Sequence, residues 1–193
     1  MSTRDEQYRA YVEARRGELL RTAVLLTAGD QWAAEDLVQT ALTRLYVAWS
    51  RVRADSLDAY VRRCLLNALI DHRRLAATRH EQTRSELPET AVSDSQRIDM
   101  QSAVFAALGG LPPRMRAAVV MRHVVDLSVE ETAEALGCRR GTVKSQTARG
   151  LDQLRTALRA EGVDVDPVPA RSVSRRGRPS LGVRSGNDVP SNS

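Results

Sequence analysis

The sequence predicts an all-α protein built from two small helical domains. Apolar residues recur at three- and four-residue spacing along most of the chain, and the alternation of β-branched residues that is typical of strands is missing. A length of 193 residues suffices for two small cores. We expect a first domain over residues 5–76, a flexible linker over 77–97, a second domain over 98–162 and a disordered basic tail over 163–193.

Three helices are expected in the first domain. The first ends at the turn signal Gly29-Asp30 and could break near Gly17. The second spans residues 33–49, where one broad apolar stripe predicts a core-facing side. This stripe consists of Ala34, Leu37, Val38, Ala41, Leu42, Leu45, Tyr46 and Trp49. The third helix follows the polar segment 50–56 and runs to about residue 75.

The second half of the chain begins and ends with changes in composition. Residues 77–97 hold Thr, Ser, Glu, Arg and one Pro without a coherent apolar stripe, which is typical of a linker. Helical pattern resumes at residue 98, stops at Gly109-Gly110 and restarts after Pro112-Pro113, since proline suits the first turn of a helix. After residue 162 a single Leu and no aromatic residue remain, which is too little apolar surface to order a tail.

Residues 128–158 have the pattern of a helix-turn-helix. Ser128 and Glu131 have the spacing of a capping box, and Gly137 supplies the left-handed turn that ends a short helix. The next apolar stripe starts at Val143, in a helix beginning near Arg140. Its exposed side has residue types that contact bases and phosphates: Arg139, Arg140, Lys144, Ser145, Gln146 and Arg149. The alternative is a helical hairpin with an ordinary solvated basic face.

Composition narrows the class of protein. The net charge of +5 and the pI near 9.8 favour an acidic partner such as nucleic acid. Cys64 and Cys138 lie within helical patterns and are expected to be reduced thiols in the cytoplasm. There is no signal peptide and no apolar run long enough to insert into a membrane. The three histidines do not cluster, so we expect no metal site, no catalytic residues, no cofactor and no small-molecule substrate.

The order of three sequence blocks resembles the extracytoplasmic-function sigma factors of bacterial RNA polymerase. The blocks are A-E-D-L-V-Q at residues 34–39, R-x-x-x-N ending at Asn67, and G-T-V-K-S at residues 141–145. The resemblance implies an all-α protein with a sigma region 2 domain for the minus-ten promoter element and a region 4 domain for the minus-thirty-five element. It also implies that the chain is no enzyme itself but directs core RNA polymerase to promoter DNA.

The resemblance implies roles for particular residues. Asp36, Leu37, Val38 and Gln39 would dock on the clamp helices of the polymerase β′ subunit, and the second domain on the β flap. Around the minus-ten element, Asn67 would lie beside the pocket for an unstacked base, while cations neutralise phosphates. These cations are Arg62, Arg63, Arg73 and Arg74. Arg116 and Arg122 are expected to contact the DNA backbone upstream, and an anti-sigma factor is a further expected partner.

Two other functions fit parts of the sequence. A free-standing helix-turn-helix regulator would bind palindromic half-sites as a dimer, and its first domain would hold a ligand or a dimer seam. A small enzyme with an incidental helical hairpin is a third possibility, but no catalytic constellation supports it. The first-domain blocks favour the sigma factor over both.

Overall fold

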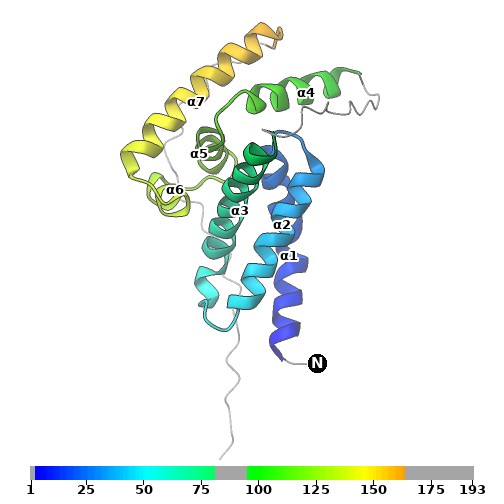
Figure 1. Cartoon of the computed structure of the whole chain (residues 1–193), viewed down its shortest axis with the longest axis vertical. Helices are drawn as coiled ribbons and strands as arrows, with labels where there is room; N and C mark the ends of the chain where they lie inside the picture. The colour runs from blue at the N-terminus through cyan, green and yellow to red at the C-terminus, as the bar shows by residue number, and fades with distance from the viewer. Residues whose placement is uncertain (1–2, 81–94, 164–193) are drawn as a thin grey trace, which may run out of the picture.

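The computed structural model describes residues 3–80 and 95–163, and all regular structure within these ranges is helical. The helices are α1 (Thr3–Leu26), α2 (Gln31–Ala48), the short 3-10 helix η1 (Ala54–Ser56), α3 (Leu57–His80), α4 (Ser95–Gly109), α5 (Pro113–His123), α6 (Val129–Leu136) and α7 (Arg140–Ala160). Figure 1 shows their arrangement. The predicted all-α fold is confirmed for the described residues. None of the helices in these two ranges is long and apolar enough to cross a membrane.

The turn between α1 and α2 is tight and depends on left-handed backbone. Helix α1 continues through Gly17 without a break and ends at Leu26. Ala28 and Gly29 then adopt positive φ values of 57° and 94°. The Asp30 side chain caps α2 by accepting a hydrogen bond of 2.9 Å from the Ala33 backbone N–H. The predicted stop at Gly29-Asp30 is therefore confirmed.

Helices α1, α2 and α3 form an antiparallel bundle, which we call the first unit. Helix α2 packs on both α1 and α3. Its core side chains are those of the predicted stripe up to Leu45, whereas Tyr46 is partly exposed and Trp49 half-buried. Tyr8 lies edge-on against Tyr46 and Trp49, with ring centroids 4.9 and 5.4 Å away. These aromatic contacts join the start of α1 to the end of α2.

The predicted linker is shorter at both ends than expected. Helix α3 continues to His80 rather than ending near residue 75, and α4 begins at Ser95 rather than at residue 98. Good helix formers after Arg74, including Leu75, Ala76 and Ala77, explain the extension of α3. Residues 81–94 of the expected linker and residues 164–193 of the expected tail lie outside the described residues.

Helices α4 to α7 form a second unit. Pro113 lies in the first turn of α5, where its missing N–H costs no hydrogen bond. Helix α7 packs closely on α5, because Gly150 faces Val119 and Met115. A Cβ atom on Gly150 would lie 2.6 Å from Val119 Cγ2, so only glycine permits this approach. This contact fixes how α7 sits on the unit.

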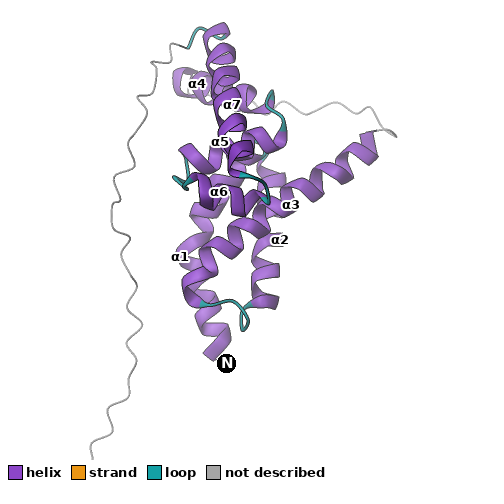
Figure 2. Ribbon diagram, turned by 90° about the vertical axis from the view of Figure 1, so that its left-hand side faces the viewer, coloured by secondary structure: helices purple, strands orange, loops and turns teal. Residues whose placement is uncertain are grey.

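The two units pack against each other over a continuous apolar core. Helix α1 contacts α4 and α5, and α3 contacts α6. One cluster of buried residues runs from Leu26 and Leu69 in the first unit to Leu108, Leu111 and Met121 in the second. Figures 1 and 2 show the second unit covering the end of the bundle where α1 terminates. The described chain is thus a closed arrangement of the two units.

Candidate nucleic-acid interface

The helix-turn-helix predicted from the sequence is present and is formed by α6 and α7. The Ser128 Oγ accepts a hydrogen bond of 3.0 Å from the Glu131 N–H, and the Ser128 N–H donates one of 2.8 Å to the Glu131 carboxylate. Gly137 ends α6 in the left-handed conformation with φ 60°. Helix α7 begins at Arg140, as predicted. The local sequence signals therefore determine both helix ends.

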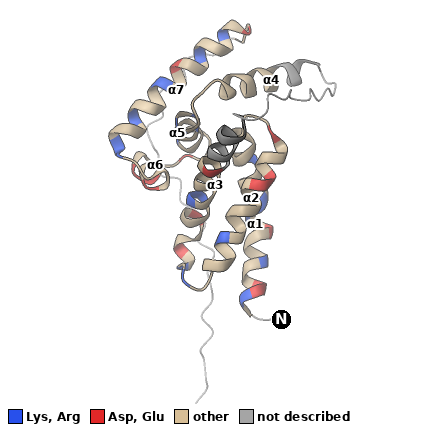
Figure 3. Ribbon diagram, in the orientation of Figure 1, with Lys and Arg blue, Asp and Glu red and all other residues tan. Residues whose placement is uncertain are grey.

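The first half of α7 presents a cationic face to solvent. Val143 and Gly150 are buried on its inner side. Arg139, Arg140, Lys144, Ser145 and Arg149 are exposed on the other side, while Gln146 is half-buried. Figure 3 shows Lys and Arg positions distributed along α7. Such a face can enter a DNA groove and donate hydrogen bonds to bases and phosphates.

Two polar groups of this face also have partners within the protein. The Ser145 hydroxyl donates a hydrogen bond of 3.1 Å to the Thr142 carbonyl. Arg140 forms an ion pair of 3.3 Å with Glu130, which lies on α6. Sequence reasoning missed the role of Glu130, although an acidic residue in the first turn of this helix was visible. Because Glu130 holds one cation of the face, it competes with phosphate for that cation.

The second polar face lies on α3. Arg63 and Asn67 are four residues apart and both are exposed, so they share one side of the helix. An amide at this point can read a base edge, and a guanidinium can bind a phosphate. Arg73 and Arg74 belong to the same helix, but their side chains lie outside the described residues.

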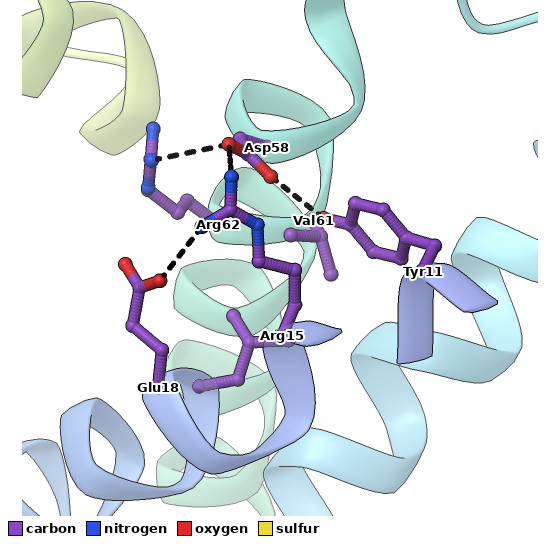
Figure 4. A pocket seen from close by; sticks show the side chains of 7 residues that line it. Tyr11, Arg15, Glu18, Asp58, Val61 and Arg62 are labelled. Carbon is purple, nitrogen blue, oxygen red and sulfur yellow. Dashed lines mark hydrogen bonds and ion pairs between the residues drawn. The ribbon is translucent and has the colours of Figure 1, made fainter. Parts of the chain in front are cut away.

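Arg62 does not share this face. Its side chain is 13% exposed and lies 4.0 Å from the Asp58 carboxylate. The same carboxylate accepts hydrogen bonds of 3.0 Å from Arg15 and 3.1 Å from the Tyr11 hydroxyl (Figure 4). Burial and the Asp58 charge raise the pKa of Tyr11, so its hydroxyl remains a donor. In this structure Arg62 is therefore mostly buried and pairs with Asp58 within α3, while Arg15 and Tyr11 tie that carboxylate to α1; its role as a phosphate contact stays a prediction.

A third surface lies on α2. Asp36 and Gln39 are exposed, whereas Leu37 and Val38 are each 1% exposed in the core. A residue buried to this degree cannot touch a partner, so the prediction that Leu37 and Val38 contact the polymerase is corrected. Trp32 is 90% exposed, and it precedes Asp36 by four and Gln39 by seven residues on the same side of the helix. Sequence reasoning missed this tryptophan.

A known protein-family model matches each of the two units. The family model described as "Sigma-70 region 2" matches residues 11–79, and that described as "Sigma-70, region 4" matches residues 101–154. An "RNA polymerase sigma-E factor" of Streptomyces avermitilis is 38% identical over 174 residues, which cover 89% of this chain and 93% of that protein. The chain belongs to the sigma-70 family of RNA polymerase sigma factors. It binds core RNA polymerase and directs promoter recognition and transcription initiation.

Further relatives agree with this family. The "RNA polymerase sigma-E factor" of Streptomyces coelicolor is also 38% identical, over 89% of this chain and 94% of its own length. Among solved structures, the sigma factor RpoE of Bartonella quintana in complex with the anti-sigma factor NepR shares the fold with a TM-score of 0.67 at 23% identity. That match covers 80% of this chain and 98% of the other. Sigma factors of this family are non-catalytic initiation factors.

Arg116 and Arg122, which were expected to contact promoter DNA, both form hydrogen bonds within the protein. Arg116 is 1% exposed and donates hydrogen bonds to three backbone carbonyls. Arg122 is half-buried and donates a hydrogen bond to the Leu127 carbonyl. The buried Arg116 guanidinium cannot reach a phosphate in this structure, so that expectation is wrong, whereas the contact expected of the half-buried Arg122 stays a prediction. The partners of both arginines are backbone carbonyls, and helical spacing in the sequence does not predict such hydrogen bonds.

Proposed function

We propose that the exposed face of α7 binds the minus-thirty-five promoter element. This face comprises Arg139, Arg140, Lys144, Ser145, Gln146 and Arg149. The observation that carries the proposal is the joint exposure of Lys144, Ser145 and Arg149 on the second helix of a helix-turn-helix. In this motif the second helix enters the major groove and its N-terminal residues contact base edges. Residues 98–162 are the proposed region 4 unit.

The exposed side of α3 is the proposed minus-ten surface. Arg63 and Asn67 lie together there, and Arg74 follows on the same helix with a side chain outside the described residues. Strand opening requires that a base be unstacked and held, while cations neutralise the separated backbone. Asn67 supplies the amide and Arg63 supplies a cation. Residues 5–76 are the proposed region 2 unit.

The polymerase-docking face is proposed to consist of Trp32, Asp36 and Gln39 on α2. These side chains are exposed at helical spacing, and the apolar side chains between them are buried. An exposed tryptophan beside polar groups is the type of residue that dominates protein interfaces. Its exposure also means that it contributes little to the core of the first unit.

The tryptophan can be tested by binding measurements. Trp32→Ala is expected to weaken binding to core polymerase by about tenfold or more, with the free energy of unfolding unchanged. Glu13→Ala is the control, because Glu13 is exposed on α1 and lies outside the proposed face. Equal polymerase affinity for Trp32→Ala and the wild type would remove Trp32 from the face, and Asp36→Ala and Gln39→Ala would then test the remainder.

An anti-sigma protein is a proposed further partner. Two solved structures that share the fold are complexes: RpoE with the anti-sigma factor NepR, and CnrH with the cytosolic domain of CnrY, the latter with a TM-score of 0.59. We expect the product of a neighbouring gene to block initiation when it is added before core polymerase. Initiation that continues unchanged with each such product would contradict this partner.

The whole proposal is tested by reconstitution. Purified chain and core polymerase are mixed with a promoter library, and initiation at a defined pair of elements is expected. We also propose that the chain works in the cytoplasm, where the polymerase is, and catalyses no reaction itself. Failure to bind the polymerase, together with dimeric binding to palindromic DNA, would instead support a free-standing helix-turn-helix regulator.

A further inference from the structure

We infer that Tyr11 of α1 is a positioning residue for the proposed minus-ten surface. Its side chain contacts both ends of the α2–α3 loop, residues 50–56, and thereby fixes this loop beside Arg63 and Asn67 of α3. The inference rests on the proposed minus-ten function of α3. It deepens that function, because it gives α1 a part in promoter opening.

The α2–α3 loop is continuous with the exposed side of α3. The loop ends in η1, and Leu57 follows directly in helical conformation. From the end of the loop onward, exposed residues at three- and four-residue spacing share one side of the helix. They are Ser56, Ala59, Arg63 and Asn67. At a rise of about 1.5 Å per residue, the loop lies about 16 Å from Asn67 along the helix, which is about five nucleotides at the duplex spacing of about 3.4 Å.

The ring of Tyr11 holds the first end of the loop. Trp49, the C-cap residue of α2, comes directly before the loop. The Tyr11 ring lies edge-on to the Trp49 ring, with centroids 5.7 Å apart and planes at 64°. Tyr8, one turn earlier on α1, packs on the same indole at 5.4 Å. Such aromatic pairs stabilise a particular geometry as well as burying area, so Trp49 has a defined position on α1.

The hydroxyl of the same tyrosine holds the second end of the loop. It donates a hydrogen bond of 3.1 Å to the carboxylate of Asp58, in the first turn of α3. Arg15 donates one of 3.0 Å to the other oxygen of this carboxylate. Both side chains come from α1 and point toward Asp58 (Figure 4). Hydrogen bonds to a charged acceptor are stronger than neutral ones, so α1 holds the start of α3 firmly.

The side-chain contacts within the loop are more exposed than those at its ends. Arg53 and Asp55 form an ion pair of 3.0 Å, but their side chains are 83% and 64% exposed. Such a pair contributes little in water. The Ser56 hydroxyl donates to the same carboxylate at 2.9 Å, also at the surface. The half-buried contacts of Tyr11 therefore determine where the loop lies relative to α1.

The position of the loop matters at the opening step. A base that leaves the stack loses its stacking and pairing, and the protein surface has to compensate for this loss. A loop that is already ordered loses less conformational entropy when it binds the strand. Upstream duplex binding is proposed to occur through α7, which does not include this loop. Release of the loop is therefore expected to affect strand opening and to leave upstream binding unchanged.

Tyr11→Phe, with Tyr8→Phe as the matched control, tests the inference. Each substitution removes one hydroxyl from α1 and leaves a ring against Trp49. The Tyr8 hydroxyl donates a hydrogen bond of 3.0 Å to the Leu42 carbonyl within α2, whereas the Tyr11 hydroxyl reaches past the loop to Asp58. Both variants lose a hydrogen bond of similar length, but only Tyr11→Phe releases the second end of the loop. The free energy of unfolding is measured for both.

Each variant is assembled with core polymerase and assayed on three kinds of DNA. These are a minus-thirty-five duplex, a complete promoter for open-complex formation, and single-stranded minus-ten DNA with each base replaced in turn. We expect Tyr11→Phe to slow opening by about three- to tenfold and to reduce the base preference, with duplex binding unchanged. Tyr8→Phe should leave all three properties within about twofold of the wild type. Base preference separates positioning from general support of the fold, because a loss of stability alone would not alter it.

Two results would overturn the inference. One is an equal effect of Tyr11→Phe and Tyr8→Phe on opening, and the other is unchanged opening and base preference in Tyr11→Phe. Asn67→Ala in the same assay distinguishes this failure from a failure of the proposed function. If Asn67→Ala loses opening and Tyr11→Phe does not, only the positioning role is wrong. If neither variant changes opening, the proposed minus-ten surface is wrong as well.

Discussion

Helices α3 and α7 both have cationic side chains at helical spacing, but these side chains differ in how far they are exposed to a DNA partner. On α7, Lys144 and Arg149 project from the outer side of a helix that rests on α5 through Gly150. On α3, Arg62 is drawn inward to Asp58 while its neighbour Arg63 remains exposed. The difference teaches that helical spacing identifies a cationic face, but the burial of each side chain and a neighbouring carboxylate decide which cations can reach DNA.

The largest expected effect concerns the support of α7. Gly150→Ala would place a Cβ atom 2.6 Å from Val119 Cγ2 and 3.0 Å from Met115 Cγ. Helices α5 and α7 would have to separate, so we expect the free energy of unfolding to fall by about 1–3 kcal/mol. Chemical denaturation measures this change. Promoter binding should weaken as well, because the position of α7 on its unit depends on this contact.

Gly141→Ala is the matched control for Gly150→Ala. Gly141 also lies in α7, but a Cβ atom there meets nothing within 4 Å. We expect unchanged stability or a gain of up to about 1 kcal/mol, because alanine favours helix more than glycine does. Similar destabilisation by both substitutions would show that helix propensity, and not the close contact with α5, makes Gly150 necessary.

A smaller effect distinguishes the two neighbouring arginines of α3. Arg62→Ala leaves Asp58 with one fewer cation, so we expect a loss of about 1 kcal/mol in stability and little change in binding to single-stranded minus-ten DNA. Arg63→Ala should leave stability unchanged, weaken that binding and lower its salt slope by about 1. Denaturation and salt titration measure the two properties. The reverse pattern would contradict the assignment of Arg62 to the fold and Arg63 to the DNA face.

The smallest expected effect concerns Glu130 on the helix-turn-helix. Glu130→Gln should release Arg140 and raise affinity for a minus-thirty-five duplex by a few fold, because an exposed ion pair is worth about 0.2–1 kcal/mol. Glu134→Gln is the control, since it removes the same charge from α6, and Glu134 has no ion pair among the described residues. Equal gains in affinity from both substitutions would show that net charge, and not the release of Arg140, causes the effect. Fluorescence anisotropy at one salt concentration suffices.

The parts of the fold that sequence reasoning predicted are those fixed by local signals. The capping box of Ser128 and Glu131, the turn at Gly137 and the stop at Gly29 each depend on residues within a few positions. Periodicity also placed Leu37 and Val38 in the core stripe of α2, and the structure confirms this. Their assignment to the polymerase surface came from the resemblance, and it disagreed with that periodicity.

The parts that sequence reasoning missed depend on contacts between distant segments. Asp58 lies four residues before Arg62 on α3, but its bond to Arg15, 43 residues earlier on α1, is a contact between distant segments. Arg116 looked like a surface cation of a short helix, but its partner Leu26 lies 90 residues away. Helical spacing contains no information about such partners, because they become neighbours only when the helices pack. Glu130 and Trp32 are plain in the sequence, but their roles follow only from the ion pair of Glu130 and the exposure of Trp32.

The division of labour between the two helices is tested most directly by comparing Asn67→Ala with Lys144→Ala on one promoter. Each holoenzyme is assayed for binding to the closed duplex and for open-complex formation over a range of salt concentrations. We expect Asn67→Ala to weaken opening more than duplex binding, and Lys144→Ala to weaken upstream binding and lower its salt slope by about 1. Equal losses at both steps from both variants would contradict the account.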